Sequence, residues 1–143
     1  MDAEIKQICE EIVKSSAEEK VKRARGSLAV LLQGLEKAGL NDDQKRGFVF
    51  NIVKLFVSAD ASCTGYEYSF FKAVTGIEPI TKDQFYAMTN HGRDPQFVDA
   101  MVEAIGAFDS ETKCAIVYFG VTFLASDLEL TQDEFALIDR FFE

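Results

Sequence analysis

Wherever apolar residues are periodic in this chain, they recur three or four positions apart, which is the spacing of one face of an α-helix. No segment alternates apolar and polar residues as a half-buried β-strand does. The two clearest stripes contain Ile5, Ile8, Cys9, Ile12 and Val13 in the first segment, and Val21, Ala24, Leu28, Leu31, Leu32 and Leu35 in the second. The pattern predicts an all-α fold, a compact bundle of seven to eight helices.

Residues that cap helices set the expected boundaries. Ser16 followed by Glu19 is a capping box, in which each side chain satisfies a backbone N–H that the start of a helix leaves free. Gly39 is typical of the glycine C-cap that ends a helix. Further helix starts are predicted at Asn41, Thr64, Thr81, Asp94 and Thr131. The third helix should run to about residue 60, and the almost wholly apolar residues 110–126 should form the most buried helix.

The composition favours one domain over residues 1–143. Hydrophobic residues make up 48% of the chain, and 13 Phe and 4 Tyr supply the volume of a core, which excludes a disordered chain. No apolar run is long enough for a membrane span, and the charged, amphipathic start does not resemble a signal peptide. Cys9, Cys63 and Cys114 are odd in number and far apart in sequence, as expected of reduced thiols. We therefore expect a cytoplasmic protein without membrane insertion.

The formal net charge of −9 is unevenly distributed. Residues 1–54 contain 10 basic and 9 acidic side chains, whereas residues 55–143 contain 5 basic and 15 acidic ones. The acidic part would repel phosphate groups, so nucleic-acid binding is not expected. The one basic cluster is interpreted as a solvated helix face and consists of Lys20, Lys22, Arg23 and Arg25. Cations and basic partners suit the acidic part better.

One short phrase occurs twice. Residues 56–67, FVSADASCTGYE, and residues 123–134, FLASDLELTQDE, align without a gap at an offset of 67. The identical pairs are Phe56 and Phe123, Asp60 and Asp127, Thr64 and Thr131, and Glu67 and Glu134. Similarity in character extends over residues 42–74 and 109–142. We therefore predict two copies of a helix–loop–helix unit related by an internal pseudo-two-fold repeat.

The repeated acidic residues have two interpretations. Asp60 and Asp127 are expected at or just beyond the last turn of a helix, where the macrodipole disfavours an anion by up to about 1 kcal/mol. In the structural interpretation, each Asp accepts backbone N–H groups of its own loop, while Glu67 and Glu134 belong to capping boxes. In the functional interpretation, carboxylates of both copies bind one divalent cation, Ca²⁺ or Mg²⁺. The predicted metal ligands are Asp60, Glu67, Asp127 and Glu134, with Glu129 and Asp133 in support.

Other known site patterns do not occur. An EF-hand that starts at Asp60 would need a bidentate Glu where Phe71 stands, and one that starts at Asp127 would need it where Ile138 stands. His91 is the single histidine, so neither a zinc site nor a catalytic triad is indicated, and no glycine-rich phosphate loop is present. We expect no enzyme and no cofactor other than the divalent cation.

The duplicated pattern of a helix, Ala59-Asp60 or Ser126-Asp127, a loop, Thr64-x-x-Glu67 or Thr131-x-x-Glu134, and a second helix resembles the TerB-like family. That family is named for a bacterial tellurite-resistance protein, and a related domain opens a membrane-anchored DnaJ-type co-chaperone. The resemblance implies a helical bundle whose acidic face binds divalent metal through the four matching carboxylates. Ala61 and Leu128 stand where the family usually has Gly.

Two functions follow as expectations. The first is a non-enzymatic, cation-binding or scaffolding domain in a bacterial stress or metalloid-resistance setting, as the resemblance implies. The alternative is a metal-independent protein-interaction module, similar to a co-chaperone domain, that uses a groove between the repeats. A hydrolase that uses a carboxylate pair is a third and more distant option.

Overall fold

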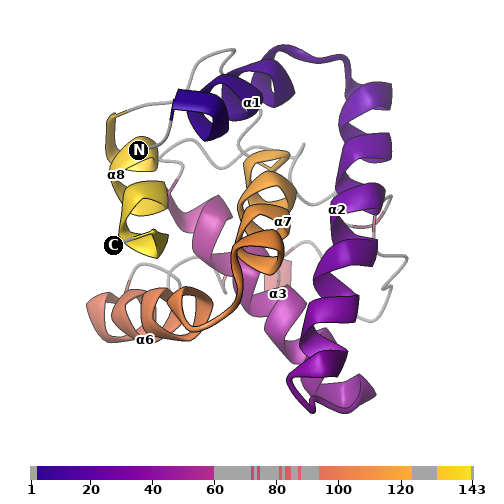
Figure 1. The fold of residues 1–143 in the computed structure, drawn as a ribbon, viewed down its shortest axis with the longest axis vertical. Helices are drawn as coiled ribbons and strands as arrows, with labels where there is room; N and C mark the ends of the chain where they lie inside the picture. Colours follow the sequence, from indigo (N-terminus) through magenta and orange to yellow (C-terminus); the bar gives the residue numbers. More distant parts are fainter. Residues whose placement is uncertain are drawn as a thin grey trace.

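The computed structural model describes residues 3–59, 94–123 and 132–142, together with residues 72, 74, 81, 83, 84 and 87. At positions 58, 59, 133 and 134 it describes the backbone alone. Over this part of the chain the regular structure is entirely helical, as the periodicity predicted (Figure 1). The helices are α1 (Ala3–Lys14), α2 (Ala17–Lys37), α3 (Asp42–Ala59), α6 (Pro95–Gly106), α7 (Ser110–Val121) and α8 (Gln132–Phe141).

The helix ends form where the capping residues predicted them. The N–H of Glu19 donates to the hydroxyl of Ser16 at 3.2 Å, at the start of α2. The same helix ends at Lys37, and two residues later Gly39 has a φ of 91°, the left-handed conformation that glycine adopts without strain. The N–H of Leu40 then donates to the carbonyl of Leu35 at 3.2 Å, which completes a Schellman motif. The predicted bounds of α2 are confirmed.

The later helices also begin at side-chain caps. The N–H of Gln44 donates to Oδ1 of Asn41, and the N–H of Asn41 donates to Oε1 of Gln44, both at 2.9 Å. Asp94 accepts the N–H of Gln96 at 3.0 Å, and Pro95 follows at the first position of α6. These local interactions satisfy donors that the first turn of a helix leaves unpaired, so the predicted starts of α3 and α6 are confirmed.

Helix α7 is the central and most buried helix, as predicted, and it packs most extensively against α2 (Figure 1). Its predicted end at residue 126 is wrong, because the α-helix stops at Val121. The Thr122 hydroxyl donates to the carbonyl of Phe119 at 2.5 Å, and the N–H of Phe123 donates to the carbonyl of Gly120 at 3.0 Å. These two bonds satisfy carbonyl groups of the last turn and end the helix there. The apolar run of the sequence is therefore longer than the helix.

A single apolar core holds the helices together. Every described helix contributes to it, and four of its largest fully buried side chains are Phe56, Phe119, Phe123 and Phe141. The rings of Phe56 and Phe141 join α3 to α8 with centroids 5.9 Å apart, a separation typical of a favourable aromatic pair. None of the described helices combines the length and the hydropathy that a membrane crossing requires.

Candidate functional site

The predicted metal ligands fall mostly outside the described residues. Asp60, Glu67 and Asp127 lie there, as does the supporting Glu129. Glu134 and Asp133 lie in the first turn of α8, with their backbone alone described. Among the side chains that the structure describes, no group of three or more His, Cys, Asp or Glu could hold a metal ion.

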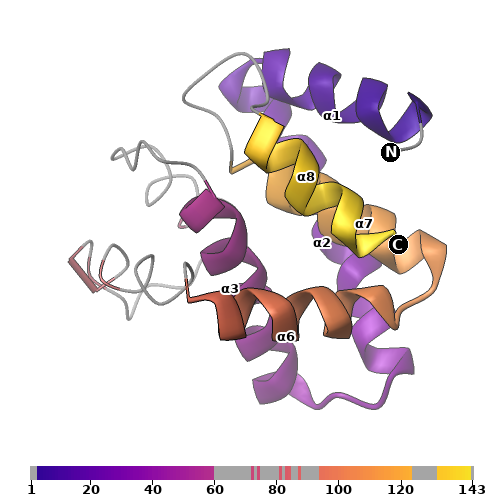
Figure 2. The same ribbon diagram turned by 90° about the vertical axis from the view of Figure 1, so that its left-hand side faces the viewer.

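The described helices nevertheless show where the chain enters each copy of the repeated phrase. Helix α3 ends at Ala59, directly before Asp60, and α7 ends at Val121, shortly before the second copy. Figures 1 and 2 both show the C-terminal ends of α3 and α7 at the same end of the bundle, where α8 also begins. Two helix C-termini carry partial negative charge there, which favours a cation.

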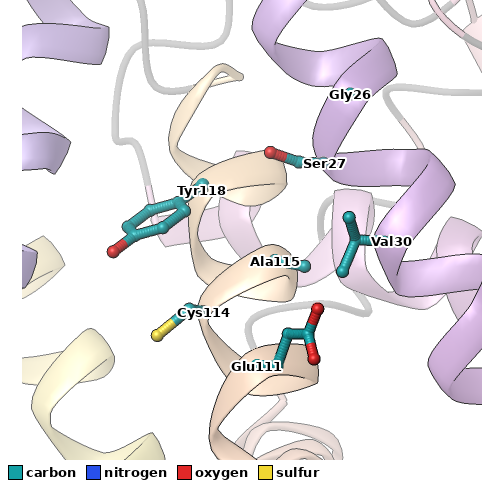
Figure 3. Close-up of a pocket in the computed structure, with 7 residues that line it drawn as sticks. All are labelled: Gly26, Ser27, Val30, Glu111, Cys114, Ala115 and Tyr118. Carbon is teal, nitrogen blue, oxygen red and sulfur yellow. The ribbon is translucent and has the colours of Figure 1, made fainter.

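A separate pocket of about 320 Å³ lies between α2 and α7 (Figure 3). One wall comes from α2 and contains the small residues Gly26 and Ser27, and the other comes from α7. The lining residues are Gly26, Ser27, Val30, Glu111, Cys114, Ala115 and Tyr118. Because Glu111, Cys114 and Tyr118 are spaced by three and four positions, they form one stripe on an otherwise buried helix.

Two free thiols and a phenol lie on α1 and α7, which pack against each other. Cys9 of α1 is a fully buried free thiol, and burial, followed by the charges of Cys114 and Glu10, raises its pKa to about 12. Burial raises the pKa of Tyr118 as well, followed by the charge of Cys114 and a hydrogen bond to its side chain. Figure 3 shows the Cys114 sulfur and the Tyr118 hydroxyl pointing away from α2 on the same side of α7. The cluster therefore joins α1 to α7.

The interaction of these two thiols could hardly be predicted from the sequence. Cys9 and Cys114 stand far apart in the chain, and they act on each other only because α1 packs on α7. The available signal was that each belongs to a helical stripe, because Cys9 lies on the apolar face of α1 and Cys114 lies in the apolar segment that forms α7.

The predicted basic face of α2 needs one correction. Lys22, Arg23 and Arg25 are exposed, whereas Lys20 retains only 5% of its accessible surface. Burial lowers the pKa of Lys20, because an apolar environment disfavours the charged ammonium. The four-carbon stem of a lysine can pack on apolar surface near the start of a helix. Counting charges along the sequence does not predict this packing.

Comparisons with protein-family models, with curated proteins and with solved structures find no match to this chain.

Proposed function

We propose that this chain is a non-enzymatic helical domain that binds Ca²⁺ or Mg²⁺ through carboxylates of both copies of the repeated phrase. The proposed ligands are Asp60, Glu67, Asp127 and Glu134. The observation that supports the proposal is the common position of three helix ends: the C-terminal ends of α3 and α7 and the start of α8 (Figures 1 and 2). The ligands of one ion must converge on it. Because α3 and α7 end at the same end of the bundle, both copies of the repeated phrase leave the helices in the same region (Figures 1 and 2).

The donor chemistry fits a hard cation. Four carboxylates offer the oxygen ligands that Ca²⁺ and Mg²⁺ prefer, and the remaining positions of the ion can be filled by water or backbone carbonyls. A carboxylate directly after a helix C-terminus meets the negative end of the macrodipole, and a bound cation offsets this repulsion. The acidic excess of residues 55–143 acts in the same direction.

Matching burial supports the proposed internal repeat. Positions related by the offset of 67 are buried alike in α3 and in or just after α7: Val49 and Ile116, Ile52 and Phe119, and Phe56 and Phe123. We infer that residues 42–74 and 109–142 are two copies of one helix–loop–helix unit in a bundle of seven to eight helices. Because of this repeat, we prefer the TerB-like family as the assignment. That family implies a cytoplasmic role in stress response or metalloid resistance.

Thermal unfolding in EDTA and in millimolar Ca²⁺ or Mg²⁺ tests the proposal. An ion present at about 100 times its Kd stabilises the folded state by about 2.7 kcal/mol, so the unfolding midpoint should rise. The double variant Asp60→Asn with Asp127→Asn should lose this rise. An equal midpoint in EDTA and in the metal solutions would refute cation binding.

A matched control removes two carboxylates elsewhere. Asp43→Asn with Glu103→Gln changes the net charge equally at two exposed positions, one on α3 and one on α6. This control should retain the full metal-dependent rise. A loss of the rise in both double variants would assign the effect to general charge screening.

The pocket favours a second candidate function, a metal-independent protein-interaction module. It presents the partly exposed, apolar Val30 beside the polar Ser27 and Glu111 on the surface of the bundle. Binding of a partner that docks there should be lost on Val30→Arg, which places a long charged side chain at the pocket, and should be equal in EDTA and in Ca²⁺. Binding that requires the metal would instead assign the partner to the cation site.

A further inference from the structure

The last turn of α8 is fastened to three other helices. Nη2 of Arg140 lies 2.6 Å from Oδ1 of Asp99 on α6. The ring of the fully buried Phe141 packs against that of Phe56 on α3, with centroids 5.9 Å apart. Nζ of Lys113 on α7 donates to the carbonyl of Phe141 at 3.4 Å. These contacts fix the end of α8 relative to α3, α6 and α7.

Lys113 acts as a C-cap that a different helix supplies. The last four carbonyl groups of an α-helix have no partner within the helix, and Lys113 offers a donor to one of them. Its ammonium also lies 5.5 Å from the centroid of the Phe142 ring. Because the macrodipole favours a cation at a helix C-terminus, Lys113 holds the last turn through its charge as well as through the hydrogen bond.

The first turn of α8 has weaker described contacts. Nζ of Lys6 on α1 lies 5.2 Å from the centroid of the Phe135 ring. Lys6 is exposed, and a cation–π contact at an exposed site stabilises only slightly. The same turn contains Glu134, one of the proposed cation ligands, and it lies at the end of the bundle where α3 and α7 end (Figures 1 and 2).

Helix α8 depends on docking for its helical form. It has 10 residues, whereas isolated helices shorter than about 12–15 residues are marginal in water. Its side chains Ile138 and Phe141 are fully buried in the core. A short helix of this kind opens locally while the rest of the fold stays intact, and its stability can therefore be regulated separately.

The charge of the proposed ligands links this opening to the cation. Without an ion, carboxylates that converge on one point repel one another, which favours movement of the first turn away from the bundle. With an ion bound, Glu134 shares it with Asp60 and Asp127, so the first turn cannot leave without breaking the site.

We propose that α8 is a cation-dependent docking element: a bound Ca²⁺ or Mg²⁺ holds its first turn through Glu134, while Lys113 and Arg140 keep its last turn on the bundle as a pivot. Because the ion holds α8 only where the proposed cation site exists, this regulation rests on the proposed function. Ion binding and docking of the first turn are then one linked equilibrium.

Hydrogen exchange of the full chain, followed by mass spectrometry, measures the opening of α8. The parent protein is compared in EDTA and in Ca²⁺ at about 100 times the Kd that calorimetric titration gives. In EDTA, the protection factors of residues 136–141 should be lower than those of residues 31–35 in α2, as local opening requires. In Ca²⁺ they should rise by up to about 100-fold, because an ion that is lost on opening lowers the open population by that factor.

Variants of lysine test the pivot. Lys113→Met removes the cap and its charge, and Lys22→Met removes one positive charge from an exposed position of α2. In EDTA, residues 136–141 of Lys113→Met should exchange roughly two- to fivefold faster than in the parent, as expected for loss of a cation at a helix C-terminus. Lys113→Arg and Lys22→Met should exchange like the parent. Equal exchange in Lys113→Met and in the parent overturns the pivot.

The comparison of EDTA with Ca²⁺ needs no variant, and it distinguishes failure of the docking proposal from failure of the cation site. Binding of one ion with unchanged protection of residues 136–141 leaves the cation site intact and overturns the docking proposal. Equal protection of residues 136–141 and residues 31–35 in EDTA also overturns it, because α8 would then open only with the whole fold. No binding of Ca²⁺ in the calorimeter refutes the cation site and the regulation together.

Discussion

Gly120 of α7 lies directly against the ring of Phe56 of α3, and a β-carbon at position 120 would overlap the ring carbons. The absence of a side chain at Gly120 lets the two helices approach closely just before their C-terminal ends. Gly34 of α2 has the same relation to the Thr112 side chain on another side of α7. Close contacts at glycine therefore position the helix that leads into the second copy of the repeated phrase.

Replacing Gly120 by Ala should destabilise the fold. The added methyl group has no free volume, because Phe56 is fully buried and cannot turn outward. Overpacking of this kind typically costs about 1–3 kcal/mol. Urea unfolding followed by circular dichroism would measure the loss in the free energy of unfolding.

Gly26→Ala and Gly47→Ala are the matched controls for that substitution. Both glycines lie in helices, are exposed, and have no atom near the position of an added β-carbon. Alanine in a helix interior is favoured over glycine by roughly 0.5–1 kcal/mol, so each control should stabilise the fold. A stabilising effect of Gly120→Ala equal to that of the controls would contradict the close packing of α3 on α7.

Stability should fall at alkaline pH, in part because of Cys9. Below about pH 9 the Cys9 thiol is protonated in both the folded and the unfolded chain and contributes no pH dependence. Between its ordinary pKa of 9.0 and its folded value of about 12, the unfolded chain binds fewer protons. The free energy of unfolding then decreases by at most about 1.4 kcal/mol per pH unit. Denaturation series on the parent and on Cys9→Ala would show a shallower decrease in the variant, and equal slopes would exclude a buried Cys9.

The local parts of the fold could be predicted from sequence. The starts of α2, α3 and α6 depend on side chains within three residues of the helix, such as Ser16, Asn41 and Asp94, so a linear pattern contains them. The end of α7 at Val121 could not be predicted in this way, because the apolar Phe123 remains in the core after the helix stops. A hydrophobic pattern predicts which residues are buried, but it does not by itself predict where a helix ends.

The features that depend on tertiary packing escaped prediction. Lys20 appeared to belong to a solvated basic face, and only the assembled bundle buries it. Cys9 and Cys114 influence each other electrostatically through the packing of α1 on α7, which no spacing rule encodes. For the four carboxylates the prediction stands untested, because their side chains lie outside the part of the chain that the structure describes.

Calorimetric titration of the metal-free protein with Ca²⁺ and with Mg²⁺ tests most directly whether one cation joins the two copies. The account predicts one ion per chain, and either Asp60→Asn or Asp127→Asn alone should abolish or greatly weaken its binding, because both carboxylates contact the same ion. Asp43→Asn should bind like the parent. No binding at millimolar metal, or two ions of which each single variant removes only one, would contradict the shared site.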